Sequence, residues 1–196
     1  MKRAAVTTFV IFFVLAPAVA LAHPGHDGAG GLMYGFVHPV TGIDHVLAMI
    51  AVGVLAALYG GRALWLVPMS FLFAMAAAGA IGMAGIPVQI VEAGIGFSIV
   101  VLGLMIAFQI KPPTLIAMVV VGFFALFHGY AHGSEMPDGL AGLSFAAGLL
   151  VATALLLSAG AGLGLILQRR TSSRRLIQAG GGAMALVGIA VLANFL

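Results

Sequence analysis

Six apolar stretches, each roughly long enough to cross a bilayer, dominate this sequence and are separated by short breaks rich in Gly, Pro or charge. A helix needs about 20 predominantly apolar residues to span the hydrocarbon core of a membrane. Apolar residues make up 63% of the chain and charged residues 7%, which leaves too few polar side chains to cover a water-soluble globule. We therefore predict an all-α, polytopic membrane helix bundle.

The predicted bundle is a single transport domain over residues 23–196, with six transmembrane helices after a cleaved signal peptide. The expected helices are Leu32–Leu58, Ala63–Met83, Val88–Ile110, Thr114–His132, Leu140–Leu167 and Leu176–Phe195. Gly and Pro mark the breaks between them because both residues interrupt helices for backbone reasons.

Residues 1–22 have the pattern of a secretory signal peptide. Lys2 and Arg3 form a basic start, an apolar core follows over 6–19, and Ala20-Leu21-Ala22 offers the small-x-small pattern of a cleavage site. Cleavage after Ala22 leaves His23 as the mature N-terminus. The alternative interpretation is a retained first transmembrane helix.

Basic residues in the connections predict the orientation. Arg62, Lys111 and a run of four arginines over 169–175 occupy the first, third and fifth connections, whereas the second and fourth carry no Lys or Arg. The positive-inside rule places the basic connections in the cytoplasm. We expect a multi-pass protein of the bacterial inner membrane with a periplasmic mature N-terminus. The pI of about 9.8 reflects these loop charges, so no nucleic-acid partner is predicted.

A first cluster of ionisable residues lies in the first predicted helix, as His38, Asp44 and His45. On a continuous helix, His38 and His45 share a face because they are seven residues apart. Pro39 and Gly42 can open the helix locally and let all three side chains converge. At about 1.5 Å per residue from the start of the helix, His45 lies roughly 20 Å deep.

A second cluster lies at the end of the fourth predicted helix, as His128, His132 and Glu135, which share one face if the helix continues. Ionisable residues inside membrane helices are costly and therefore indicate function. Imidazole with carboxylate suits nickel, cobalt, zinc, copper or ferrous iron, and the chain has no cysteine to supply a thiolate.

The roles of Glu92 and of the predicted mature N-terminus each have two interpretations. Glu92 either lines the same outer vestibule or sits at the membrane interface. The predicted N-terminus, with the His23 imidazole, a free α-amine and His26, is either a metal-capturing segment or a polar start without that role.

The chain resembles the HupE/UreJ family of nickel permeases. The resemblance rests on a signal peptide followed by His-Pro-Gly-His, on His38-Pro39-x-x-Gly42-x-Asp44-His45, and on Phe127-His128-Gly129-x-Ala131-His132-Gly133-x-Glu135. It implies a secondary permease that brings nickel across the inner membrane for hydrogenase or urease maturation, while some relatives handle cobalt. It also implies that both clusters supply the metal-pathway residues.

The leading functional hypothesis is import of Ni²⁺, as a transported substrate with no resident cofactor and no enzymatic activity. No phosphate-binding loop of the form Gly-x-x-x-x-Gly-Lys-Ser/Thr occurs, so a gradient or the membrane potential must supply the energy. Three alternatives stay open: Co²⁺ transport, a membrane-embedded zinc hydrolase built on His128 and His132, and proton conduction. The sequence makes no prediction about oligomeric state.

Overall fold

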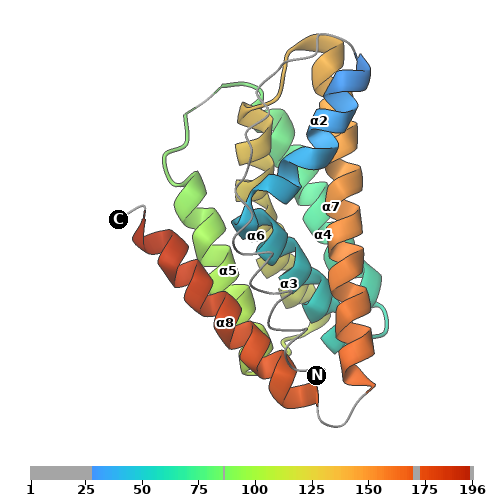
Figure 1. The fold of residues 1–196 in the computed structure, drawn as a ribbon, viewed down its shortest axis with the longest axis vertical. Helices are drawn as coiled ribbons and strands as arrows, with labels where there is room; N and C mark the ends of the chain where they lie inside the picture. The colour runs from blue at the N-terminus through green and yellow to red at the C-terminus, as the bar shows by residue number, and fades with distance from the viewer. Residues whose placement is uncertain (1–27, 86, 170–172, 195–196) are drawn as a thin grey trace, which may run out of the picture.

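The computed structural model describes residues 28–85, 87–169 and 173–194, and the predicted signal peptide, His23 and His26 lie outside them. Within these residues every regular element is a helix, as predicted, and Figure 1 shows their arrangement. The helices are α2 (Gly28–Thr41), α3 (Ile43–Tyr59), α4 (Ala63–Gly82), α5 (Val91–Ala107), α6 (Thr114–Ser134), α7 (Gly139–Gln168) and α8 (Ser173–Ala193).

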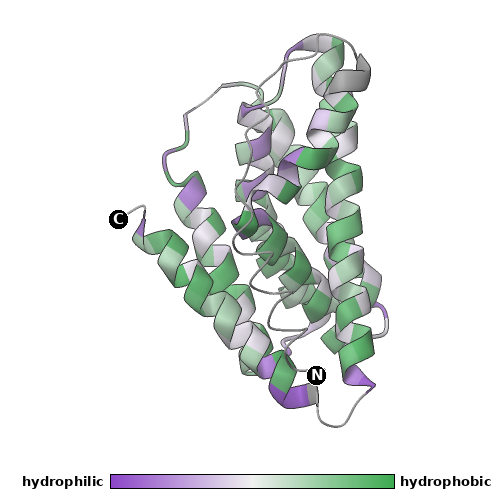
Figure 2. Cartoon of the chain, in the orientation of Figure 1, coloured by the Kyte–Doolittle hydropathy of each residue, from purple (hydrophilic) through white to green (hydrophobic). Residues whose placement is uncertain are grey.

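The lateral surface of the bundle is apolar. Phe73 and Leu186 are each 69% exposed and Phe123 is 53% exposed, and Figure 2 shows hydrophobic residues along most of the outer ribbon. Four helices are long and apolar enough to cross a membrane: α4, α6, α7 and the part of α8 over Arg174–Ala193. Lipid is the only solvent that accommodates so much exposed apolar surface, so the chain is a multi-pass membrane protein.

The first predicted helix is not continuous over Leu32–Leu58, whereas the local opening predicted at Pro39 and Gly42 is present. It is broken at Gly42 into α2 and α3, which bend by 83° relative to one another. Pro39 lies in the last turn of α2, where it cannot donate a backbone hydrogen bond, and Gly42 adopts an extended conformation (φ −93°, ψ 114°) as the N-cap of α3. The shared face of His38 and His45, and the depth counted along one straight helix, therefore no longer apply.

The third predicted helix is shorter than expected. It runs over Val91–Ala107 rather than 88–110, and its 17 residues give a length of about 25 Å. The six predicted spans thus correspond to four full-length helices, one broken pair and one short helix in the described part of the chain.

Glycines bring the helices together in pairs. A Cβ at Gly53 or Gly160 of α3 and α7 would meet the backbone of the opposite helix, and Gly129 and Gly133 of α6 press in the same way on α4. In lipid, such close backbone approach replaces the hydrophobic drive that operates in water. The order of these contacts along the chain makes α3 and α7 parallel and α4 and α6 parallel, whereas α5 and α8 are antiparallel.

This pairing of helices places the connections that carry basic residues at one end of the bundle. The α3–α4 and α5–α6 connections, the end of α7 and the start of α8 lie at the lower end in Figure 1, and the α4–α5 and α6–α7 connections lie at the upper end. The lower end therefore holds Arg62 and Lys111. Of the acidic residues that the structure describes, Glu92, Glu135 and Asp138 belong to helix ends or connections toward the upper end, and Asp44 lies in the first turn of α3, at the break between α2 and α3.

Candidate metal pathway

The break between α2 and α3 faces the C-terminal end of α6, so the two motifs meet at one site. A pocket of about 140 Å³ opens there, and hydrophilic residues gather in this region in Figure 2. Its lining comes from the end of α2, the start of α3, the first turn of α5 and the last turns of α6: His38, Thr41, Gly42, Asp44, His45, Glu92, Ala131, His132 and Glu135. Five of the six predicted site residues described here line this pocket, and His128 lies beside it.

Four imidazoles form a continuous series across the helices. The ring centroids of His38 and His132 are 5.0 Å apart, those of His132 and His45 are 4.5 Å apart, and those of His45 and His128 are 5.3 Å apart. Consecutive members come alternately from the α2–α3 segment and from α6. We call this series the histidine ladder.

The ladder runs from the surface into the core. The His38 and His45 side chains are 17% and 14% exposed, His132 is 2% exposed and His128 is fully buried. Beyond His128 lies the apolar core, where the Phe71 ring centroid is 5.5 Å from that of His128. The pocket therefore opens toward the upper end and is closed below His128.

Hydrogen bonds orient two rungs of the ladder. Asp44 Oδ1 lies 2.9 Å from His45 Nδ1 and accepts the His45 backbone N–H at the same distance, and His128 Nδ1 lies 3.0 Å from the Phe124 carbonyl oxygen. An acceptor at Nδ1 fixes the neutral ring with its proton there and leaves Nε2 as a bare lone pair. Metal-ligating histidines are typically held by such partners.

The two deepest imidazoles each have an unsatisfied nitrogen. His128 Nε2 and His132 Nε2 are buried and have no hydrogen-bond partner among the described residues. A buried polar atom without a partner costs about 1–3 kcal/mol, so its persistence calls for an explanation. Because Nδ1 of His128 is bonded to the Phe124 carbonyl oxygen, the lone pair of its Nε2 can serve as a metal ligand.

Glu135 marks the mouth of the pocket. Glu135 was expected to share a face with His128 and His132 only if the helix continued, and α6 ends at Ser134 with Glu135 as its C-cap. Its Oε2 instead lies 2.9 Å from His38 Nε2, and its side chain is 61% exposed. The hydrogen bond with His38 lowers the pKa of Glu135 although its partial burial opposes this shift. The carboxylate is therefore ionised at neutral pH.

The glycines of both motifs have a steric role. A Cβ on Gly42 would lie 2.8 Å from Asp44 Oδ1 and 2.9 Å from His45 Nδ1, so a larger residue would press on this pair. Gly129 and Gly133, which follow His128 and His132, allow α6 to pack directly on the α4 backbone. The glycine after each α6 histidine thus fixes the position of that histidine along α4.

Glu92, for which the sequence left two interpretations, lines the pocket from the first turn of α5. Thr41 also lines the pocket and was not predicted; its hydroxyl donates to the His38 carbonyl oxygen at 2.7 Å. The signal that pointed to Glu92 was an acidic residue within an otherwise apolar helix. Nothing about Thr41 in the sequence distinguished it from a residue in a helix-ending turn.

No three His, Cys, Asp or Glu side chains in the described part of the chain are placed as a ready-made metal-ligand set. The carboxylates are paired with imidazoles instead, Glu135 with His38 and Asp44 with His45. Binding of a metal ion by three or more of these side chains therefore requires that the carboxylates and imidazoles of these pairs separate first.

Comparison with known proteins identifies the group to which this architecture belongs. The sequence profile of the family described as HupE / UreJ protein matches residues 11–191. The chain belongs to the HupE / UreJ family. It is also 42% identical over 192 residues to Protein HupE of Rhizobium leguminosarum bv. viciae, which covers 98% of this chain and 99% of that protein. No solved structure matches the chain.

Both motifs of the histidine ladder fall inside the HupE / UreJ match, as do all described residues up to 191. The resemblance inferred from these motifs is therefore confirmed at the level of the family.

Proposed function

We propose that the chain is an inner-membrane secondary permease that imports a divalent transition metal, foremost Ni²⁺, for the maturation of a metalloenzyme such as hydrogenase or urease. Membership of the HupE / UreJ family and the membrane helices support a transport role. The observation that carries the proposal is the histidine ladder, which leads from the partly exposed His38 to the fully buried His128 and whose two most buried rings, His132 and His128, keep unpartnered Nε2 atoms.

In this proposal the ion enters at the exposed carboxylate of Glu135, beside His38, and then meets His132, His45 and finally His128. Asp44 and Glu92 add negative charge around the same pocket and attract a dication. The imidazoles replace hydration water one ligand at a time. Neighbouring rings about 5 Å apart allow the ion to be handed on without full rehydration.

The membrane potential favours inward movement. A dication gains about 4.6 kcal/mol per 100 mV when it moves to the negative side. With the upper end of the bundle outside, as the basic residues of the lower end predict, the pocket faces the source of metal and the closed core faces the cytoplasm. The His23 and His26 segment, on the same predicted side, is proposed to deliver metal to Glu135.

The donor chemistry narrows the substrate. Neutral imidazole with carboxylate suits Ni²⁺, Co²⁺ and Zn²⁺, and the pocket lining has no thiolate or thioether that would favour Cu⁺. Ni²⁺ is preferred over Co²⁺ because of the family resemblance.

Radioactive nickel uptake by the purified protein in liposomes, with cobalt, zinc and ferrous iron as competitors, tests this function. Replacement of His45 or His128 by Ala should reduce uptake to the level of empty liposomes, and Glu92→Gln should reduce it partially. Ser70→Ala is the matched control, because the Ser70 hydroxyl bonds only to Val67 within its own helix. Unchanged uptake in the two histidine variants would refute this pathway.

The same preparation distinguishes transport from metal-dependent hydrolysis or proton conduction. A permease should exchange metal rapidly and should move no protons when metal is absent. Stoichiometric zinc that exchanges slowly would instead favour an enzyme, and metal-independent proton flux would favour a proton channel.

A further inference from the structure

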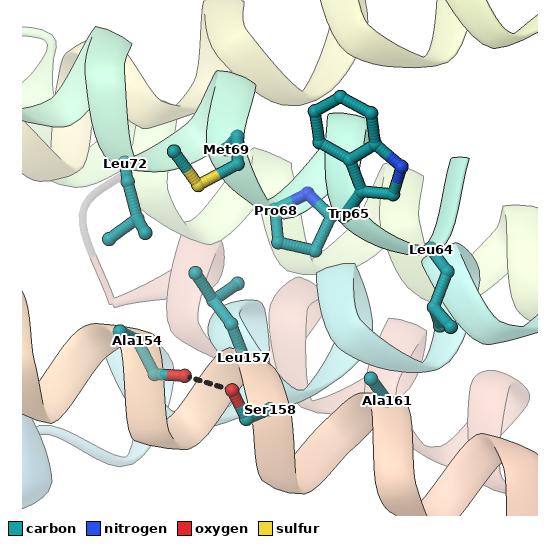
Figure 3. Close-up of a pocket in the computed structure, with 9 residues that line it drawn as sticks. All are labelled: Leu64, Trp65, Pro68, Met69, Leu72, Ala154, Leu157, Ser158 and Ala161. Atoms are coloured by element: carbon teal, nitrogen blue, oxygen red, sulfur yellow. Dashed lines mark hydrogen bonds between the residues drawn. The ribbon is translucent and has the colours of Figure 1, made fainter. Parts of the chain in front are cut away.

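A second cavity lies on the membrane-facing side, away from the histidine ladder. It has a volume of about 240 Å³ and is a groove between α4 and α7 (Figure 3). In that view Leu64, Pro68 and Leu72 of α4 face α7, and Leu157 of α7 reaches toward α4 between the smaller Ala154, Ser158 and Ala161. It is lined by Leu64, Trp65, Pro68, Met69 and Leu72 of α4 and by Ala154, Leu157, Ser158 and Ala161 of α7.

Most of the groove lining is apolar, and its polar side-chain groups are the Ser158 hydroxyl and the Trp65 indole N–H. The hydroxyl of Ser158 donates to the Ala154 carbonyl oxygen at 2.7 Å, as Figure 3 shows, so it presents no free donor to an occupant. Trp65 and Met69 stay 59% and 39% exposed at its rim. An occupant of this groove must therefore be a hydrocarbon chain or an apolar helix.

The dimensions of the groove match one leaflet. From Leu64 to Leu72 it extends about 12 Å along α4, compared with about 15 Å for half of a hydrocarbon core of about 30 Å. It begins in the first turn of α4, where Trp65 occupies the position typical of an interfacial aromatic residue. The groove thus runs from the membrane surface at the lower end toward the middle of the bilayer.

Charge at the open end favours an anionic headgroup. Arg62 is exposed, immediately precedes α4 and forms no ion pair within the described residues. Among the described residues the ionisable side chains of this end are basic: Arg62 in the α3–α4 connection, Lys111 in the α5–α6 connection, and Arg169, Arg174 and Arg175 at the end of α7 and the start of α8. No acidic side chain of the described chain therefore competes with a phosphate for Arg62.

We propose that this groove binds one acyl chain of an anionic phospholipid, with the lipid phosphate at Arg62. The lipid fills the space between α4 and α7, whose mutual packing is otherwise slight, and links the α4–α6 pair to the α3–α7 pair. The site is independent of the metal pathway and of the metal that the pathway carries.

Native mass spectrometry of the intact protein, released from nanodiscs of mixed phosphatidylglycerol and phosphatidylcholine, tests the proposal. The wild type should retain phosphatidylglycerol in preference to phosphatidylcholine. Arg62→Gln should lower that retention about fivefold, the loss expected for one basic side chain at an anionic surface. Lys111→Gln removes the same charge from another connection of the same end and should leave retention unchanged.

A second pair of variants tests the acyl-chain half of the site. Ser158→Phe fills the groove and should abolish lipid retention, whereas Val151→Phe, on an exposed part of α7 outside the groove, should not. Equal loss in Arg62→Gln and Lys111→Gln, or equal retention of both lipids by the wild type, would overturn the proposal. So would efficient disulfide formation between copies carrying Ser158→Cys, because this otherwise cysteine-free chain would then place a second copy in the groove.

Discussion

Replacing His128 by Leu should abolish metal uptake and leave the bundle at least as stable as the wild type. Most substitutions of a fully buried residue destabilise a protein, so this expectation is unusual. It follows from the Nε2 atom, which is buried and has no hydrogen-bond partner in the part of the chain that the structure describes.

The magnitude follows from two opposing terms. Removing a buried, unsatisfied nitrogen should recover about 1–3 kcal/mol. The hydrogen bond between His128 Nδ1 and the Phe124 carbonyl oxygen is lost as well, and such bonds average about 0.6 kcal/mol inside membrane proteins. Leu has a similar volume and should leave little cavity, so the net stabilisation is between about 0.4 and 2.4 kcal/mol.

The change in stability is measured by unfolding the purified protein in mild detergent and following the fluorescence of Trp65, the chain's single tryptophan. The loss of transport is measured as nickel uptake in liposomes. Ser98→Ala is the control, because Ser98 is also fully buried but its hydroxyl bonds to the Ile95 carbonyl oxygen at 2.6 Å. That variant should be slightly less stable and should transport normally. A His128→Leu protein that is destabilised by more than about 1 kcal/mol, or that still transports, would contradict the proposed role of the bare nitrogen.

Two further predictions concern the mouth of the pocket. Gly42→Ala should lower nickel uptake about 10–100-fold, because its Cβ would press on the bonded Asp44 and His45 side chains. Loss of a hydrogen-bond partner of a metal ligand typically lowers metal affinity by that factor. Gly162→Ala is the control that should keep full uptake, because a Cβ at Gly162 meets nothing within 4 Å. Glu135→Gln should raise the KM for nickel by the same factor at about pH 6.5 and about pH 8, since a carboxylate with a lowered pKa stays ionised as the pH falls until that lowered pKa is reached. A factor that shrinks markedly at the lower pH would show that Glu135 is already protonated there.

The sequence predicted which ionisable residues gather around the pocket better than how they are arranged there. Ionisable residues are so costly in apolar helices that His38, Asp44, His45, His128 and His132 stood out without any structure. Helix periodicity then failed at Gly42, where the chain bends by 83°, because the backbone conformation of a single glycine depends on what packs around it.

The partners of the histidines were not predictable for a related reason. His45 meets His132 and His38 meets Glu135 across helices that are far apart in sequence, and these pairings depend on the crossing of α2, α3 and α6. The lateral groove at Trp65 is equally invisible in the sequence. It results from the slight packing of α4 against α7, which no hydrophobic pattern encodes when both helices are apolar on every side.

The order of ligands along the histidine ladder follows from the cost of burying each one while it is empty. A buried carboxylate without a partner costs several kcal/mol, whereas an unpartnered neutral imidazole costs about 1–3 kcal/mol. The carboxylates accordingly stay near water, with Glu135 61% and Asp44 20% exposed, and the fully buried position is occupied by His128. In the proposed pathway, neutral ligands also leave a dication only partly compensated, so we expect the ion to bind weakly at His128 and to move on from there. An arrangement with the acids inside and the imidazoles outside would hold a metal tightly and therefore serve storage rather than passage.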